Sequence, residues 1–341
     1  MNIKTIIPCI LLILAGFSFQ DKVVAQDVSK VGTTASQFLR IPVGARASGM
    51  GGAIAADVKD ASAMYWNPAG LADIKSNEIM VEYADWFLDI NHNYVGIAIP
   101  TKTGVAGLHL IALTMGEFEE TTFDLPEGTG RTFDAYMISA GVSYAAYLFP
   151  KFRLGGTVKF VHEKIFDTSA SSFAFDIGTI YDLPFFGLRF GVSLTNFGPK
   201  MNLDGDGLIL PVDVDRGSSG NFISDGKLRT DDFELPLMLR GGLAWDPYKN
   251  DRIRTTITVD GTSPNDNVQS VSVGGEIALL NELFVVRGGA PFLGLRDRVQ
   301  EFNLGLGINY GFNDLNLRFG YAFESYQYLD SVNRISVHVL F

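Results

Sequence analysis

The sequence closes on the stretch Arg334-Ile335-Ser336-Val337-His338-Val339-Leu340-Phe341. Its odd-numbered residues from Ile335 to Phe341 are all apolar, and Arg334, Ser336 and His338 between them are polar. Side chains of a β-strand point alternately to its two faces, so this stretch predicts a strand with one apolar and one polar face. Working outward from it, the same alternation recurs along the chain in segments of about ten residues.

From Glu78 onward the pattern predicts about fourteen strands. Their expected bounds are Glu78–Phe87, Asn91–Pro100, Gly104–Met115, Asp134–Leu148, Phe152–Phe166, Phe173–Asp182, Leu188–Asn196, Pro236–Asp246, Ile253–Asp260, Gln269–Leu279, Leu283–Ala290, Glu301–Tyr310, Leu315–Phe323 and Asn333–Phe341.

The connections between these strands alternate in length. Those after even-numbered strands are short, such as Thr101-Lys102-Thr103, whereas Gly116–Phe133 and Phe197–Leu235 are long. A bacterial membrane barrel keeps short turns on the periplasmic side and long loops outside. A soluble β-sandwich also alternates, but its strands average five to six residues. The sequence therefore predicts an all-β protein, a transmembrane antiparallel β-barrel of about fourteen strands.

The first 25 residues are expected to be a signal peptide. Lys4 is followed by an apolar stretch, Ile6 to Phe19, that is too short to span a membrane, and Ala25 offers a cleavage site. The single cysteine, Cys9, lies in this leader, so the mature chain is expected to have no disulfide. The net charge of −11 argues against nucleic acid as a partner.

Residues 35 to 74 are rich in Ala, Gly and Met and do not resemble a strand. Asp60 is placed to cap a short helix over Ala61–Trp66, because its carboxylate can accept from the free N–H groups of the first turn. Asn67-Pro68 is expected to end that helix, since the residue before proline avoids the helical region.

Two blocks of this segment carry a family resemblance. They are Phe38-Leu39-Arg40-Ile41-Pro42-Val43-Gly44-Ala45-Arg46-Ala47-Ser48-Gly49-Met50-Gly51-Gly52-Ala53 and Asn67-Pro68-Ala69-Gly70-Leu71-Ala72. Later pieces fit the same pattern, including Leu194-Thr195-Asn196-Phe197-Gly198-Pro199. The chain resembles the PorV/PorQ family of outer-membrane proteins, relatives of the FadL-type fatty-acid transporters. A terminal aromatic residue also resembles the end of many bacterial outer-membrane proteins.

The resemblance implies a fourteen-stranded barrel whose N-terminal segment folds into the lumen as a hatch. We therefore expect a signal peptide at 1–25, a hatch at 26–77 and an outer-membrane barrel at 78–341. The residues of the hatch motif are expected to be structural; they are Arg46, Gly49, Gly51, Gly52, Asn67, Pro68 and Gly70.

Charged residues on the predicted inner faces of the strands have both signs. Mixed signs favour an internal network of paired charges over an ion-selective path, because charges in a low dielectric need partners. The candidate network contains Arg153, Lys159, Arg240, Arg318, Glu276 and Glu301.

The resemblance implies a role in type IX protein secretion, as an accessory, cargo-shuttle or attachment component that binds secretion components and cargo C-terminal domains. Such binding would use the two long loops. The alternative is that both loops are only solvated and bind no partner. The candidate partner-binding residues are Phe118, Phe123, Asp204, Asp206, Asp213 and Asp215. The alternative is a FadL-type channel for hydrophobic small molecules such as fatty acids.

No catalytic or cofactor constellation is recognisable. The chain has four histidines and no Gly-x-Ser-x-Gly, His-Glu-x-x-His or Walker motif. Asp204-Gly205-Asp206-Gly207 fails the EF-hand pattern, because the fifth position is Leu208. We expect no enzyme activity, no cofactor and no bound metal. An outer-membrane hydrolase with Ser, His and Asp brought together across strands is the third possibility.

Overall fold

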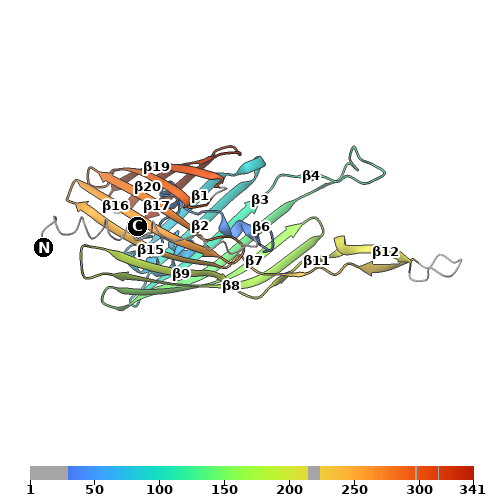
Figure 1. The fold of residues 1–341 in the computed structure, drawn as a ribbon, viewed down its shortest axis with the longest axis horizontal. Coiled ribbons are helices and arrows are strands. Elements are labelled where there is room, and N and C mark those ends of the chain that lie inside the picture. The colour runs from blue at the N-terminus through green and yellow to red at the C-terminus, as the bar shows by residue number, and fades with distance from the viewer. Residues whose placement is uncertain (1–29, 214–222, 296–297, 314) are drawn as a thin grey trace, which may run out of the picture.

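A computed structural model describes residues 30–213, 223–295, 298–313 and 315–341. The expected signal peptide and Asp215 lie outside these ranges. Figure 1 shows the barrel from the side, with long strands around the blue N-terminal segment.

Fourteen long antiparallel strands form the wall of the barrel in the described residues. They are β1 (Glu78–Asp85), β2 (Asn91–Pro100), β3 (Val105–Thr114), β6 (Ala135–Phe149), β7 (Phe152–Ile165), β8 (Thr168–Asp182), β9 (Arg189–Phe197), β15 (Met238–Lys249), β16 (Ile253–Pro264), β17 (Ser270–Leu279), β18 (Phe284–Leu293), β19 (Gln300–Phe312), β20 (Leu315–Tyr326) and β21 (Val332–Leu340).

Each wall strand pairs with its neighbours in the sequence, and two further features close the ring. The first strand pairs with the last, from Glu78↔Leu340 to Asp85↔Asn333. The long excursion between β9 and β15 leaves these two strands paired, from Met238↔Thr195 to Ala244↔Arg189. The predicted fourteen-stranded antiparallel barrel is therefore confirmed.

The largest difference from the expected bounds is at β8, which begins five residues early, at Thr168. Its first residues are small and polar, so they show no apolar alternation. They nevertheless continue the ladder with β7 to the pair Ile165↔Thr168, across a turn in which Phe166 has a φ of 53°. Pairing of the backbone, rather than side-chain pattern, sets this boundary.

The two faces of the wall have opposite character. Inward positions carry buried polar or small side chains, such as Ser139, Ser143, Thr157, Ser193 and Thr258. Outward positions carry large apolar side chains that are about half exposed, including Val81, Val95, Leu108, Val142, Val158, Phe173, Leu239, Ile257, Leu304, Leu306 and Ile335. Exposing this apolar outer surface to water would cost free energy, whereas exposing it to hydrocarbon would not. An apolar outer face and a polar inner face are the arrangement of a membrane barrel.

The segment before β1 lies inside the ring as a plug, which we call the hatch (residues 35–74). It contains η1 (Gln37–Arg40), α2 (Ala45–Gly49), α3 (Ala63–Trp66) and η2 (Pro68–Asp73). Almost all of its side chains are buried, including Phe38, Met50 and Met64. The hydrophobic core of the molecule is therefore centred on the hatch, and the inner wall surrounds it.

Inward-facing glycines of the wall let the hatch backbone come close. A Cβ built on Gly178 of β8 would lie 2.0 Å from Oδ1 of Asn67, and one on Gly289 of β18 would lie 2.1 Å from the Gly51 nitrogen. Neither position can hold a larger residue without moving the hatch.

The expected helix after Asp60 is shorter than predicted. α3 begins at Ala63, and the carboxylate of Asp60 accepts from the N–H and hydroxyl of Ser62 instead of capping the helix directly. Asn67 is extended, as expected before proline, and Pro68 then starts the separate turn η2.

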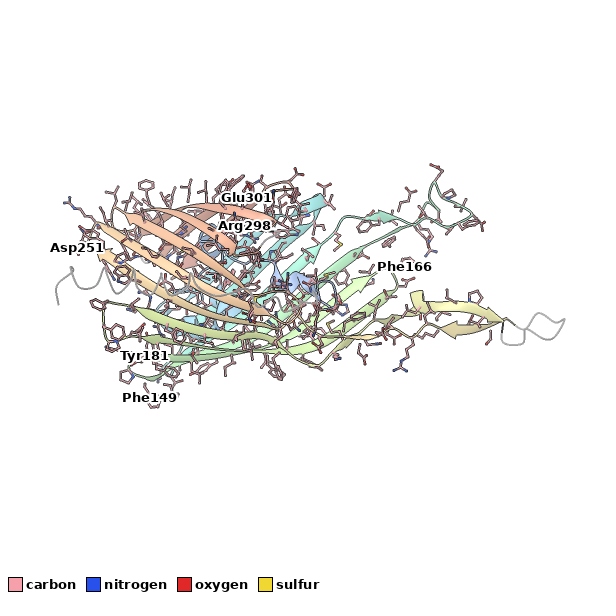
Figure 2. All side chains as sticks on the ribbon, in the orientation of Figure 1. Phe149, Phe166, Tyr181, Asp251, Arg298 and Glu301 are labelled. Atoms are coloured by element: carbon pink, nitrogen blue, oxygen red, sulfur yellow. The ribbon has the colours of Figure 1, made fainter. Side chains whose placement is uncertain are left out.

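The two ends of the barrel differ. One end carries the short turns, residues 75–77 and the end of the C-terminal strand. Figure 2 labels Phe149, Tyr181 and Asp251 at this end. At the opposite end, Figure 1 shows the β4 and β12 segments projecting beyond the wall. These segments are β4 (Phe118–Glu119), β5 (Thr132–Phe133), β10 (Met201–Asn202), β11 (Asp204–Gly205), η4 (Asp206–Leu208), β12 (Ile209–Asp213), β13 (Ile223–Lys227) and β14 (Asp232–Phe233); η3 (Phe87–Asp89) joins β1 to β2.

Candidate functional site

Arg46 of α2 joins the hatch to the wall. Its Nε lies 3.0 Å from Oε2 of Glu276 on β17, and its two terminal nitrogens donate to the carbonyl and the carboxylate of Asp57. Asp57 also pairs with Lys59 and with Arg189 of β9. One hatch arginine and one hatch aspartate thus connect the hatch to β17 and β9 through ion pairs whose carboxylates are buried.

The charged side chains around Asp57 set its protonation state. Burial alone would raise the pKa of its carboxyl, but Lys59, Arg46 and Arg189 lower that pKa well below the ordinary value. The carboxylate therefore stays charged at any physiological pH.

Asn67 is the second anchor of the hatch. Its Nδ2 donates to the Ala55 carbonyl at 2.7 Å and to the Thr179 carbonyl of β8 at 3.2 Å, and its Oδ1 accepts from the Ala69 N–H at 3.2 Å. The side chain is fully buried. An amide, with donors and an acceptor on one short side chain, satisfies hatch and wall groups together.

The four glycines of the hatch motif allow turns and close backbone packing. Gly51 and Gly52 have positive φ, at 66° and 73°, which favours glycine. Gly49 faces Gly305 of β19, and a Cβ on Gly70 would overlap the Val58 carbonyl at 2.4 Å.

The seam between β1 and β21 carries a further buried network. Arg334 donates to Glu82 at 2.5 Å and to Glu324 at 3.1 Å, and His338 lies 2.7 Å from Glu78. Glu82 also accepts from the Gly44 N–H of the hatch. Closure of the barrel and docking of the hatch therefore share the same carboxylates.

The predicted lumen charges mostly lie where alternation places them. Lys159 contacts Asp176 at 2.8 Å, Arg153 pairs with Asp73 and Asp182, and Glu276 faces three arginines. Arg240 is buried, but it makes no ion pair with a described residue. It donates to Thr195 and lies 5.0 Å from the ring centre of Trp66.

The prediction for Glu301 is wrong. The residue is exposed and accepts a hydrogen bond from Ser325, whereas Gln300 and Asn303 are buried. The ladder between β19 and β20 shifts register between Gln300 and Asn303, so a bulge turns Glu301 out of the lumen.

Sequence reasoning missed several members of these networks: Asp57, Asp73, Glu82 and Arg287. Arg287 was within reach of the alternation rule, because it shares the inward face of β18 with Val285 and Gly289. Asp57 and Asp73 lie in the non-repeating hatch, where no local pattern marks their partners.

A cavity of about 410 Å³ lies above the hatch, toward the long-loop end. Aromatic and apolar side chains such as Trp66, Trp86, Phe292 and Tyr326 line it. Arg240 supplies a guanidinium without a carboxylate partner among the described residues. The size and lining are those of a pocket for a small, largely apolar ligand.

The wall beside this cavity is not fully paired. In the described part of the chain, β18 and β19 pair only from Phe284↔Ile308 to Gly289↔Asn303. Beyond this point β18 continues alone with β17, and Phe292 and Val299 from the two diverging ends line the cavity.

The two long loops form ribbons outside the barrel. In the first, Phe118 stacks on Phe133 at 5.4 Å, and Phe123 at the tip is fully exposed. In the second, the β12–β13 hairpin stands on a base where Asp204 pairs with Lys227 and Asp206 is exposed. Asp213 ends β12, and Asp215 follows it outside the described residues.

No group of three or more His, Cys, Asp or Glu residues in the described ranges is arranged to hold a metal ion. Within the same ranges, no helix is long and apolar enough to cross a membrane.

Three solved structures share this architecture. The Pseudomonas putida toluene transporter TodX is 13% identical, with a TM-score of 0.56 over 87% of this chain and 97% of that chain. The CymD monoaromatic hydrocarbon channel is 12% identical, with a TM-score of 0.54 over 88% and 97%. The Ralstonia pickettii toluene transporter TbuX is 13% identical, with a TM-score of 0.52 over 87% and 97%. These likenesses show the fold, which is a closed β-barrel of FadL-like architecture.

The family follows from the sequence. Residues 24–235 match the profile described as type IX secretion system protein PorV, and no curated protein matches the chain. The match spans more than half of the chain, so the protein belongs to the PorV family.

Proposed function

We propose that this protein is a non-enzymatic outer-membrane component of type IX protein secretion. It would act as an accessory, cargo-shuttle or attachment component and bind secretion components and cargo C-terminal domains at its extracellular face. The observation that carries the proposal is the PorV match over residues 24–235, which covers the hatch and both long loops.

The β12–β13 hairpin supports a binding role. Ile209, Leu210 and Val212 are each about 40% exposed, and neither edge of the hairpin is paired by another described strand. An isolated two-stranded hairpin is only marginally stable in water. Its open edges are suited to adding a strand from a partner, with the exposed apolar side chains giving contact area.

The hatch supports the same proposal. Buried residues from Phe38 to Ile74 fill the middle of the lumen and are held by ion pairs and hydrogen bonds on several sides. A barrel plugged in this way is suited to presenting loops rather than conducting solutes freely.

The test is an affinity pull-down from detergent-solubilised outer membranes, with the protein bearing Leu210→Glu or Phe123→Ser. We expect cargo and secretion components to co-purify with the parent and to be strongly reduced with either variant. The matched control is Phe186→Ser, an exposed phenylalanine in a short turn at the other end. Equal recovery from all variants would refute binding through these loops.

The second candidate function is transport of hydrophobic small molecules, and the cavity above the hatch favours it. Its aromatic lining and the divergence of β18 and β19 offer a pocket and a route past the wall. Loss of fatty-acid uptake in a deletion strain with normal secretion would favour this candidate over the first.

We further propose export through the Sec system and residence in outer-membrane lipid, with removal of residues 1–25. Mass spectrometry of the purified protein should give an N-terminus near Gln26. A mature protein that retains residues 1–25 would contradict this.

A further inference from the structure

A second cavity, of about 480 Å³, lies on the other side of the hatch, toward the end with the short turns. We call it the lower vestibule. It is lined by seven lysine and arginine side chains and five aspartate and glutamate side chains, whereas the whole chain carries a net charge of −11. The vestibule is thus locally positive in an acidic protein.

Two of the five carboxylates are already engaged by arginines that do not line the vestibule. Asp73 pairs with Arg153, and Asp246 pairs with Arg189 at 2.9 Å. Arg153 and Arg189 are in turn shared with Asp182 and Asp57, and Asp57 also pairs with Arg46 and Lys59 of the lining. The groups behind the lining therefore leave its excess of positive charge, seven cations against five carboxylates, unchanged.

A third carboxylate, Glu276, is shared by three guanidinium groups. Arg46 lies 3.0 Å away, Arg254 2.9 Å and Arg287 2.7 Å. Arg46 and Arg254 each have another carboxylate partner, in Asp57 and Glu282. Arg287 has none among the described residues, so its charge is the least compensated of the three.

Arg287 is 8% exposed, and only its Nε has a hydrogen-bond partner in the described part of the chain. Its two terminal nitrogens are left to face the vestibule. The opposite strand carries Gly305 and Gly307, and a Cβ on Gly307 would lie 2.8 Å from the Nη1 atom. Gly307 thus leaves room for the guanidinium of Arg287 itself, which lies over the strand at that point.

Arg318 belongs to β20, which lies on the other side of β19 from Arg287. The register pairs Gly305 with Arg287, Gly307 with Gly320 and Asn309 with Arg318. Arg318 lines the vestibule without an ion pair to any described residue, and so do Lys75 and Lys249 at its rim. Arg287 and Arg318 thus come from the two strands that flank β19, while Gly49 and Ala45 of the hatch pack on Gly305 and Gly320.

We propose that the lower vestibule binds a small oxyanion, of the phosphate or carboxylate class, between Arg287 and Arg318. A buried cation is costly unless an opposite charge compensates it. For Arg287 that charge comes only from Glu276, which is shared with Arg46 and Arg254, and Arg318 has no carboxylate partner among the described residues. Guanidinium groups suit the task, because their planar donors match the oxygens of phosphate and carboxylate. The inference does not depend on the proposed function, since it concerns the opposite end of the barrel.

The test uses the purified mature protein in non-ionic detergent. Inorganic phosphate and citrate are titrated separately by calorimetry, in chloride buffers of matched ionic strength. We expect saturable binding of at least one of them, which also decides between the phosphate and carboxylate classes; binding of both indicates a general oxyanion site.

Arg318→Gln removes one positive charge without breaking an ion pair to a described residue. This variant should weaken binding about tenfold or more. The control is Lys102→Gln, an exposed cation in a short turn at the same end that does not line the vestibule, and this change should alter the affinity less than twofold. Arg287→Gln should weaken binding further, and far-ultraviolet circular dichroism checks that this variant still folds. Absence of saturable binding by either probe, or equal weakening by Arg318→Gln and Lys102→Gln, overturns the proposal.

Discussion

Replacing Asn67 by alanine should loosen the hatch without opening the barrel wall. The substitution leaves the Ala55 carbonyl and the Ala69 N–H, both buried, without the partners that Asn67 provides at 2.7 and 3.2 Å. An unsatisfied buried group costs about 1–3 kcal/mol, so the two together cost about 2–6 kcal/mol of hatch docking. At about 1.4 kcal/mol for each tenfold change, the undocking equilibrium should rise by at least about thirtyfold.

Hydrogen–deuterium exchange measures this directly, because peptides of the hatch and of the wall report their own opening free energies. Hatch peptides of Asn67→Ala should exchange at least about thirtyfold faster than in the parent, while wall peptides should be unchanged. The control is Asn316→Ala, an exposed asparagine on β20 whose side chain makes no hydrogen bond among the described residues. If hatch exchange in Asn67→Ala stays within about threefold of the parent, the amide is not an anchor and the reasoning fails.

Three further outcomes are expected. Gly178→Ala should mimic Asn67→Ala in hatch exchange, and the double variant should be clearly less than additive, because both changes break the same contact. Hatch protection should decline as the pH falls below about 3.9, as acid protonates Asp57. A carboxylate with a lowered folded-state pKa stabilises the fold above its unfolded pKa and loses that effect as the pH falls through the folded one; protection that stays unchanged down to about pH 2 would contradict this. Leu306→Arg, at the middle of the outward face of β19, should destabilise the barrel by about 2–4 kcal/mol in urea unfolding from lipid vesicles, and a cost near zero would place that face in water.

The wall of the barrel was predictable because its signal is local. Each strand faces lipid on one side and the lumen on the other, so alternation records the environment residue by residue. β2 has the expected bounds, and most of the others differ at their ends by a few residues. Alternation failed at Glu301, since a bulge inserts a step that no side-chain pattern marks. It also gave no warning that Arg240 would rest against Trp66 in place of a carboxylate.

The sequence by itself determined the barrel, its strand count, the side of each strand that meets lipid, and the family. These properties depend on residue order within a few positions. Only the tertiary structure decided that Arg46 reaches Glu276, that Asn67 bridges Ala55 and Thr179, and that cavities of opposite character lie on the two sides of the hatch. Such contacts join residues far apart in the chain, so they depend on the register of the closed ring and on how an irregular segment packs against glycines of the wall.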